Sequence, residues 1–194
     1  MVRPRAFDRD EALVRAIRVF WAKGYASTST EDLLAAMQIG RQSLYNTFGD
    51  KRKLYLEALE CYQRGSTAGH LERLDGSESA LAGIEALLLG LIADDDDERA
   101  LGCMGVGAVA EFGAGDPELA MLRSKVGPKL ARRLATRIRE GQAAGEIDPT
   151  LDPRQTASFL QITMQGIQLA ARAGHDAASL RALVRFAIDR FKPR

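Results

Sequence analysis

Residues 8–54 contain three short helical segments, and this stretch limits the possible folds more than any other part of the chain. The first predicted helix begins after Asp8, which is a good N-cap residue, carries an apolar stripe and ends at Gly24. Ser29 caps the start of a second helix, and a third follows over 41–48 after a tight turn. This arrangement is typical of a helix-turn-helix unit.

The remainder of the chain is also predicted to be helical. Apolar residues recur at steps of three and four, and no alternating β-branched run is bounded by hairpin turns. We therefore expect an all-α protein of about nine helices, with an N-terminal tri-helical head over 1–50 and a larger helical body over 51–194. The acidic run 94–98 is expected to be a solvated loop. His70 and His175 fall near predicted helix ends, where exposure is usual, and they have no metal-ligand spacing.

Composition and charge narrow the class of protein. No apolar stretch is long enough to cross a membrane, no signal segment follows the N-terminus, and Cys61 and Cys103 have no CxxC partner. These features favour a cytoplasmic protein without a metal site or other cofactor. Residues 1–53 hold ten Lys or Arg against six Asp or Glu, whereas the remainder holds 17 against 20. Such an asymmetry fits a nucleic-acid-binding head on a slightly acidic body.

The spaced pattern of the head is similar to that of a known family. The stretch Gly24-Tyr25-x-x-Thr28-Ser29-x-x-Asp32-Leu33, followed by Ile39 to Lys51, resembles the signature of the TetR family of repressors. That resemblance implies a homodimer that binds double-stranded operator DNA through the head. It also implies a small-molecule effector bound in the body and a pair of C-terminal helices that forms the dimer interface.

The third predicted helix has the properties of a recognition helix. Its N-terminal residues Arg41, Gln42 and Ser43 can reach base edges in a major groove, because arginine pairs with guanine and glutamine with adenine. Tyr45 and Asn46 are expected on the same outward side, opposite the residues that pack into the head core.

The resemblance to the TetR family adds further DNA contacts and two departures. It implies phosphate contacts by Tyr45 and Lys51 and by the start of the second helix at Thr28 and Ser29. Many members have a small residue at the position of Gln42 and a serine cap at that of Gly40. The operator sequence is therefore not inherited from better-known members.

The body offers apolar residues that could surround a small molecule. The expected lining comprises Cys103, Met104, Phe112, Met121, Phe159, Ile162, Met164 and Gln165. Plain core packing explains the same apolar spacing. Cys103 also resembles the cysteine of a Gly-Cys-hydrophobic motif in some TetR members, including electrophile-responsive ones, and a thiol at a helix start can be reactive.

Three functional hypotheses follow. The leading one is a repressor that an effector releases from a pseudo-palindromic operator. The second is a DNA-binding regulator that acts through protein partners without a ligand, or through oxidation of Cys103. The third, an enzyme or carrier, lacks a sequence motif: HExxH, GxSxG, P-loop and GxGxxG patterns are all absent from the chain.

Overall fold

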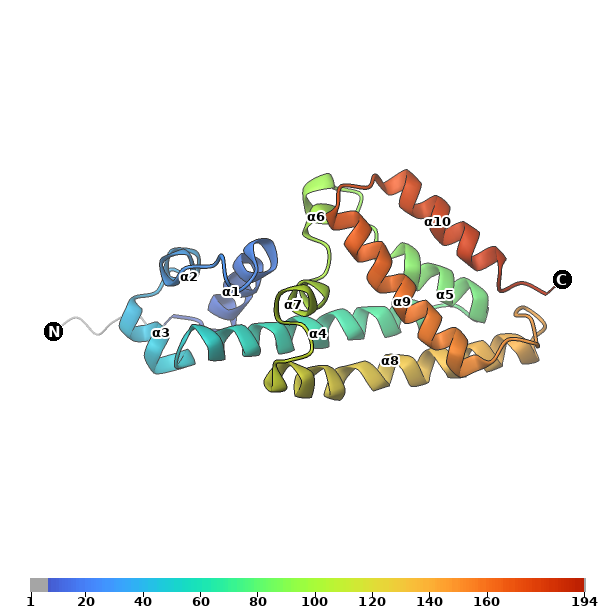
Figure 1. The fold of residues 1–194 in the computed structure, drawn as a ribbon, viewed down its shortest axis with the longest axis horizontal. Helices are drawn as coiled ribbons and strands as arrows, with labels where there is room; N and C mark the ends of the chain where they lie inside the picture. Colours follow the sequence, from blue (N-terminus) through green and yellow to red (C-terminus); the bar gives the residue numbers. More distant parts are fainter. Residues whose placement is uncertain (1–6, 194) are drawn as a thin grey trace.

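The chain folds into an elongated, all-helical molecule. A computed structural model describes residues 7–193, apart from the side chain of Val126, and contains no strand in that range. Its helices are α1 (Arg9–Lys23), α2 (Thr30–Met37), α3 (Arg41–Phe48), α4 (Lys51–Asp75), α5 (Ala80–Leu89), α6 (Asp96–Leu101), α7 (Met104–Phe112), α8 (Pro117–Ala143), α9 (Pro153–Arg172) and α10 (Ala177–Asp189). Figure 1 shows the head of α1 to α3 at one end, with α4 running from it into the body. The expected all-α fold class is confirmed.

Local capping explains where the head helices begin and end. The Asp8 carboxylate accepts hydrogen bonds from the N–H groups of Asp10 and Glu11, and α1 stops at Gly24, whose φ of 77° is easily adopted only by glycine. The predicted Ser29 cap forms a full capping box, in which Asp32 accepts from the Ser29 N–H at 2.9 Å. Side-chain chemistry close in sequence therefore determines these boundaries.

The acidic run is where the predicted secondary structure is wrong. Residues 94–98, expected as a loop, contain the start of α6, because the Asp95 side chain accepts from the Glu98 N–H and caps a short helix. Acidic residues in a first helical turn are favoured by the helix dipole. Buried Arg99 holds the segment by donating to the backbone carbonyls of Ala93, Asp94 and His175. The described residues consequently contain ten helices in place of about nine.

Two hydrophobic cores fill the molecule. One core lies in the body and joins α5, α8, α9 and α10. The other begins among the head helices and the first half of α4, but it also includes Met104 and Ala108 of α7 and Leu119 and Leu122 of α8. The head is therefore packed directly against the start of two body helices, not only attached to them through α4.

Membrane-spanning helices and metal-binding clusters are both absent from the described residues. No helix in this part of the chain is both long and apolar enough to span a membrane. Within the same residues, no three His, Cys, Asp or Glu side chains are grouped to hold a metal ion.

Candidate nucleic-acid interface

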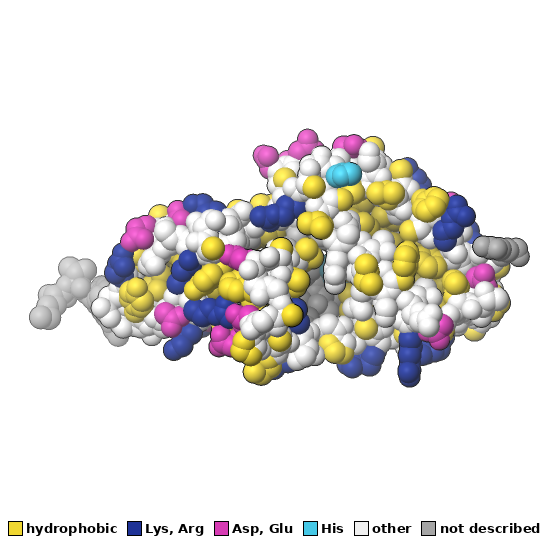
Figure 2. Space-filling view, in the orientation of Figure 1, with side chains coloured by type: hydrophobic (Ala, Val, Ile, Leu, Met, Phe, Trp, Pro, Cys, Tyr) yellow, Lys and Arg dark blue, Asp and Glu magenta, His cyan; other side chains and the backbone are white. Residues whose placement is uncertain are grey.

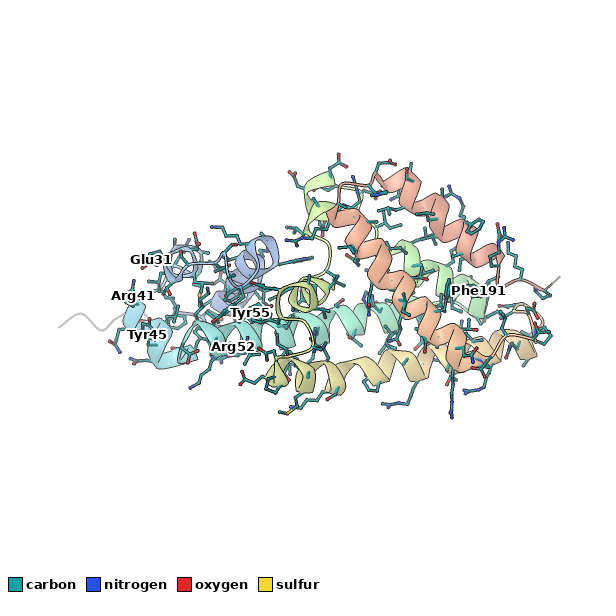
Figure 3. All side chains as sticks on the ribbon, viewed as in Figure 1. Glu31, Arg41, Tyr45, Arg52, Tyr55 and Phe191 are labelled. Atoms are coloured by element: carbon teal, nitrogen blue, oxygen red, sulfur yellow. The ribbon has the colours of Figure 1, made fainter. Side chains whose placement is uncertain are left out.

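Helix α3 has one buried and one exposed face. Leu44 and Phe48 are fully or nearly fully buried in the head core. Arg41, Gln42, Tyr45 and Asn46 are exposed, with Ser43 partly buried between the two faces. Figure 3 shows Arg41 and Tyr45 at the outer tip of the head, far from the body. The predicted base-reading residues thus form one outward-facing polar surface of α3.

These exposed side chains are held by neighbouring residues in the free protein. Arg41 forms an ion pair with Glu31 of α2, and both side chains are more than half exposed. The Gln42 side-chain amide donates to the Asn46 side-chain oxygen at 2.9 Å, four residues along the same helix. A base edge would have to replace these partners, so the internal contacts compete with binding in the major groove.

The start of α3 lacks a side-chain cap. Gly40 occupies the N-cap position with φ −77° and ψ 157°, and no side chain accepts from the first N–H groups of the helix. Because the first N–H groups of a helix have no intrahelical acceptor, this end carries partial positive charge and favours anions. Because Gly40 stands where many members have a serine cap, these donors remain available for phosphate or base acceptors.

The two residues predicted to contact phosphate at the start of α2 have different environments in the structure. Thr28 is buried, its hydroxyl donates to the Gly24 carbonyl at 2.5 Å, and its N–H donates to the Tyr25 carbonyl. A phosphate contact by the Thr28 side chain is not compatible with this placement, because the hydroxyl closes the turn between α1 and α2. Ser29 is exposed, but its side chain caps α2.

The electrostatics of this turn stabilise the capping box. Lys23 donates a hydrogen bond to Asp32 at 2.7 Å and, together with the Ser29 N–H, lowers the pKa of Asp32 to about 2. The carboxylate therefore stays ionised over the whole physiological range and keeps α2 capped.

The start of α4 is unusually basic. Lys51, Arg52 and Lys53 occupy its first turn, which contains no acidic residue, although the helix dipole favours negative charge there. Lys51, the predicted phosphate contact, is partly buried with its Nζ 4.3 Å from the centre of the Tyr25 ring. Lys53 is exposed but was not among the predicted phosphate contacts. The run of three basic residues over 51–53 could have indicated it. Cations at a helix N-terminus suit DNA phosphate.

A second set of polar contacts joins the head to the body, and no pattern in the sequence indicated it. The Glu111 carboxylate at the end of α7 accepts from the N–H groups of Tyr25 and Ala26, at 2.9 and 2.5 Å. Arg52 donates to Asp116 at 2.5 Å, and the Leu119 N–H and Arg52 lower the pKa of Asp116. Figure 3 places Arg52 and Tyr55 at this junction.

Of the eight residues expected to line an effector site, three lie around one cavity. Cys103, Met164 and Gln165 belong to the wall of a cavity of about 330 Å³ between α4, α7, α8 and α9. Met104 is buried in the head core instead. Phe112 stacks in an aromatic cluster at the head–body junction, with its ring centre 5.5 Å from that of Tyr25.

The other three predicted lining residues lie on the surface. Met121, Phe159 and Ile162 are 56%, 53% and 68% exposed and lie outside this cavity. Helix α9 is apolar on two sides, and the cavity faces the side that carries Met164, whereas Phe159 and Ile162 lie on the opposite one. His70 was predicted to be exposed near a helix end. It lies five residues before the end of α4, is partly buried and lines the cavity.

The fold and its exposed α3 surface define a helix-turn-helix transcriptional regulator. The family model "Bacterial regulatory proteins, tetR family" matches residues 12–58, and "Tetracyclin repressor-like, C-terminal domain" matches residues 80–187. The HTH-type transcriptional repressor ComR of Escherichia coli (strain K12) is 32% identical over 189 residues, covering 95% of this chain and 88% of ComR. The uncharacterized HTH-type transcriptional regulator YezE of Bacillus subtilis (strain 168) is 42% identical over 121 residues, or 62% of each chain.

A solved structure has the same architecture. It is described as the TetR family transcriptional regulator CifR, a cysteine mutant complexed with 26-bp double-strand operator DNA. It matches with a TM-score of 0.81 at 34% identity, covering 97% of this chain and 99% of that one. This chain therefore belongs to the TetR family of DNA-binding transcriptional regulators, as its sequence pattern predicted.

Proposed function

We propose that the protein is a dimeric, non-enzymatic repressor that binds a pseudo-palindromic operator and releases it when a small molecule occupies the cavity. The observation that carries this proposal is the double role of α7. Its N-cap Cys103 and one face of the helix, with Gly105, Val106 and Val109, line the cavity, and its last turn holds the head through Glu111. A ligand that moves α7 therefore acts directly on the head. Because it acts on chromosomal DNA, such a repressor works in the cytoplasm.

DNA binding by α3 is proposed on the exposed face described above, within a head of residues 1–50 and a body of 51–194. Arg41 and Gln42 read base edges, with Ser43, Tyr45 and Asn46 beside them on the helix, and Lys51 and Ser29 lie near the phosphates. The CifR complex with operator DNA supports this assignment, because that chain shares the fold over nearly its full length. Thr28 contributes through its place in the turn, since its side chain is buried.

The test of this interface uses two substitutions at one ion pair. With DNA from the region flanking the gene, Arg41→Ala is expected to weaken operator binding about 10- to 100-fold in a gel-shift assay, as for loss of a bidentate base contact. Glu31→Gln removes the carboxylate that competes for Arg41 and is expected to tighten binding. If both variants bind as the wild type does, Arg41 does not read the operator.

The dimer is proposed to form through the outer faces of α9 and α10. Five large apolar side chains on these helices are more than half exposed: Phe159, Ile162, Leu169, Leu183 and Phe186. Figure 2 shows hydrophobic side chains gathered over this part of the body. An exposed apolar surface of this kind marks an interface, and two helices from each copy would pack as a four-helix bundle.

The matched test of the dimer charges this surface. Ile162→Glu is expected to give a monomer in sedimentation velocity and to lose operator binding, because one head alone contacts a single half-site. The matched control is Arg185→Glu, which changes the charge at an exposed position of α10 without removing an apolar side chain. A dimer that survives Ile162→Glu at micromolar concentration would rule out this interface.

A second candidate function is release by oxidation or alkylation of Cys103. The residue is the N-cap of α7 and lines the cavity together with Tyr62. Modification of the thiol would therefore act on the same helix as a bound ligand. Cys103→Ser separates the two mechanisms: release by oxidants or electrophiles would be abolished, whereas release by a non-covalent effector would persist. A regulator that acts only through partner proteins would respond to neither treatment.

A further inference from the structure

The cavity wall combines an apolar surface with a few polar side chains. Its apolar part comes from Leu91, Val106, Val109, Leu130 and Met164, and its polar part includes Gln63, Ser66, Thr67, His70, Arg123, Gln161 and Gln165. A volume of about 330 Å³ is at the small end of ligand sites. At roughly 30 Å³ per water-sized group, it accepts a molecule of about ten non-hydrogen atoms.

Three buried polar atoms in this wall have no hydrogen-bond partner. They are Gln63 Oε1, His70 Nδ1 and Arg123 Nη1, and only one other such side-chain atom, on Arg137, occurs among residues 7–193. Buried polar groups in proteins are almost always paired, because each unpaired group loses its hydration without compensation. Their concentration around one cavity indicates that their partners belong to a ligand.

The two buried arginines show what the partly buried Arg123 lacks. Arg99 donates to backbone carbonyls and pairs with Asp96, and Arg137 donates to two carbonyls and pairs with Glu140. Arg123 has no such partner among the described residues, and the cavity wall contains no Asp or Glu. A guanidinium in this setting is incomplete without an anion.

The remaining polar groups of the wall add no second positive charge. Burial and the nearby Arg73 lower the pKa of His70 to about 4, so its ring is neutral at neutral pH. Its Nε2 lies 3.0 Å from the Ser66 hydroxyl, which can donate or accept. His70 Nδ1 can therefore serve a ligand as a neutral donor or acceptor, and the cavity carries the single charge of Arg123.

We propose that the effector is a small monocarboxylate with an apolar aliphatic or aromatic body of about ten non-hydrogen atoms. Arg123 binds the carboxylate after a rotation of its long side chain toward the cavity, with Gln63 and His70 as neutral partners. The apolar wall takes the hydrocarbon part. This inference rests on the proposed function only in treating the cavity as the effector site.

The charge of the site distinguishes carboxylates from other ligands. The wall offers one guanidinium and the N-terminus of α7, so its single full positive charge matches a monocarboxylate better than a phosphate dianion. An amine would place a second cation against Arg123. A neutral alcohol would fill the apolar part but leave the guanidinium unpaired.

The experiment compares ligands that differ only in their head group. Octanoate, 1-octanol, octylamine and octyl phosphate are titrated into the DNA-free protein by calorimetry, with benzoate and cinnamate as aromatic acids. Octanoate or an aromatic acid is expected to bind at least about tenfold more tightly than the neutral, cationic and phosphate probes. Arg123→Gln is expected to abolish that preference, whereas Arg132→Gln, on an exposed position of the same helix, leaves it unchanged.

Two outcomes overturn the proposal. One is that no carboxylate binds more tightly than its neutral counterpart. The other is that Arg123→Gln keeps the preference for the carboxylate.

Thermal unfolding without ligand gives an independent readout. Arg123→Met replaces an unpaired, partly buried cation by an unbranched apolar side chain and is expected to raise Tm by a few degrees, whereas a loss of Tm would show that the cation is already paired. Operator release is measured separately by gel shift. Carboxylate binding without release would contradict the proposed repressor mechanism but leave the ligand class intact.

Discussion

Acidic side chains cap helix starts in both the head and the body, but among the described residues only the body keeps buried side-chain polar atoms without partners. In the head, the acidic side chains at helix starts are hydrogen-bonded: Asp8 and Asp50 cap α1 and α4, and Asp32 completes the α2 capping box. In the body, Gln63 and Arg123 keep unpartnered atoms around a cavity. The described part of the head thus leaves no buried side-chain polar atom unpaired and offers its outer surface to DNA, whereas the body has room for another molecule.

At the junction between the head and the body, one helix belongs to both regions. Because Met104 and Ala108 of α7 lie in the head core while Gly105, Val106 and Val109 of the same helix line the cavity, α7 belongs to both. A helix shared in this way can couple the two sites, provided that the ligand binds one of its positions better than the other. Helix α4 also runs through both regions and is a second structural link between them (Figure 1).

The largest predicted effect compares the packed core of the head with the cavity wall of the body. Phe20 is 1% exposed, and its ring centre lies 5.0 Å from that of Tyr55. Phe20→Ala is expected to reduce the free energy of unfolding by about 3–5 kcal/mol. Val109→Ala, at the 47% exposed cavity wall, should cost less than about 1 kcal/mol.

Urea unfolding followed by circular dichroism at one fixed protein concentration measures both variants. Equal losses for Phe20→Ala and Val109→Ala would contradict the difference in packing between the two regions.

The second prediction separates the two regions by pH. His70 has a folded-state pKa of about 4 against 6.5 in the unfolded chain, so the unfolded state binds more protons between these values. The stability contributed by neutral His70 is complete above pH 6.5 and is lost as pH falls toward 4. Asp32 has its pKa lowered from 3.8 to about 2, so its contribution is complete above pH 3.8 and is lost only between those values.

Acid should therefore destabilise the body before the head. Urea midpoints at pH 7 and pH 4.5 are expected to differ less in His70→Gln than in the wild type, and His175→Gln, at an exposed site, should behave as the wild type does. An unchanged pH dependence in His70→Gln would show that the buried imidazole is not the group responsible.

The sequence predicted the features that depend on neighbouring residues better than those that depend on residues distant in the chain. The Asp8 and Ser29 caps and the buried face of α3 depend on residues within one or two helical turns, and they were predicted correctly. The partners of Glu111 and the cavity around Arg123 depend on helices that are distant in the chain, so no local pattern indicated them. One local cap was also missed: residues 94–98 were predicted as a loop, although Asp95 caps the start of α6.

Helix α9 shows why the cavity was only partly predicted. Its apolar residues form two faces: Leu160, Met164 and Ile167 are buried, whereas Phe159 and Ile162 are exposed. Spacing alone identifies an amphipathic helix when one face is apolar, but it cannot assign the inner side when both are. The two exposed residues were therefore placed in the cavity by mistake.

The third prediction concerns the junction. Glu111→Ala removes the acceptor for the Tyr25 and Ala26 N–H groups and is expected to cost about 1 kcal/mol of stability, since water can replace it at this exposed site. Its functional effect should be larger, because the operator affinity would respond less to a ligand in the cavity. Gel shifts with and without octanoate measure the response, and Glu78→Ala is the exposed acidic control. A full response in Glu111→Ala would assign the coupling to α4.

The smallest predicted effect lies in the turn before α3. Gln38 is the only non-glycine residue with a positive φ in the described part of the chain, at 57°, and it ends α2 in the left-handed conformation. Gln38→Gly relieves the contact between Cβ and backbone there, partly offset by the greater freedom of glycine in the unfolded chain, so a gain of up to about 1 kcal/mol is expected.

The matched control is Gln42→Gly, where the backbone is right-handed and glycine should lower stability. Opposite shifts in Tm for these two glutamine substitutions would show that the head, although its polar groups are satisfied, still holds one strained residue at the turn that orients α3. A loss of stability in Gln38→Gly would instead mean that the Gln38 side chain contributes more than its backbone conformation costs.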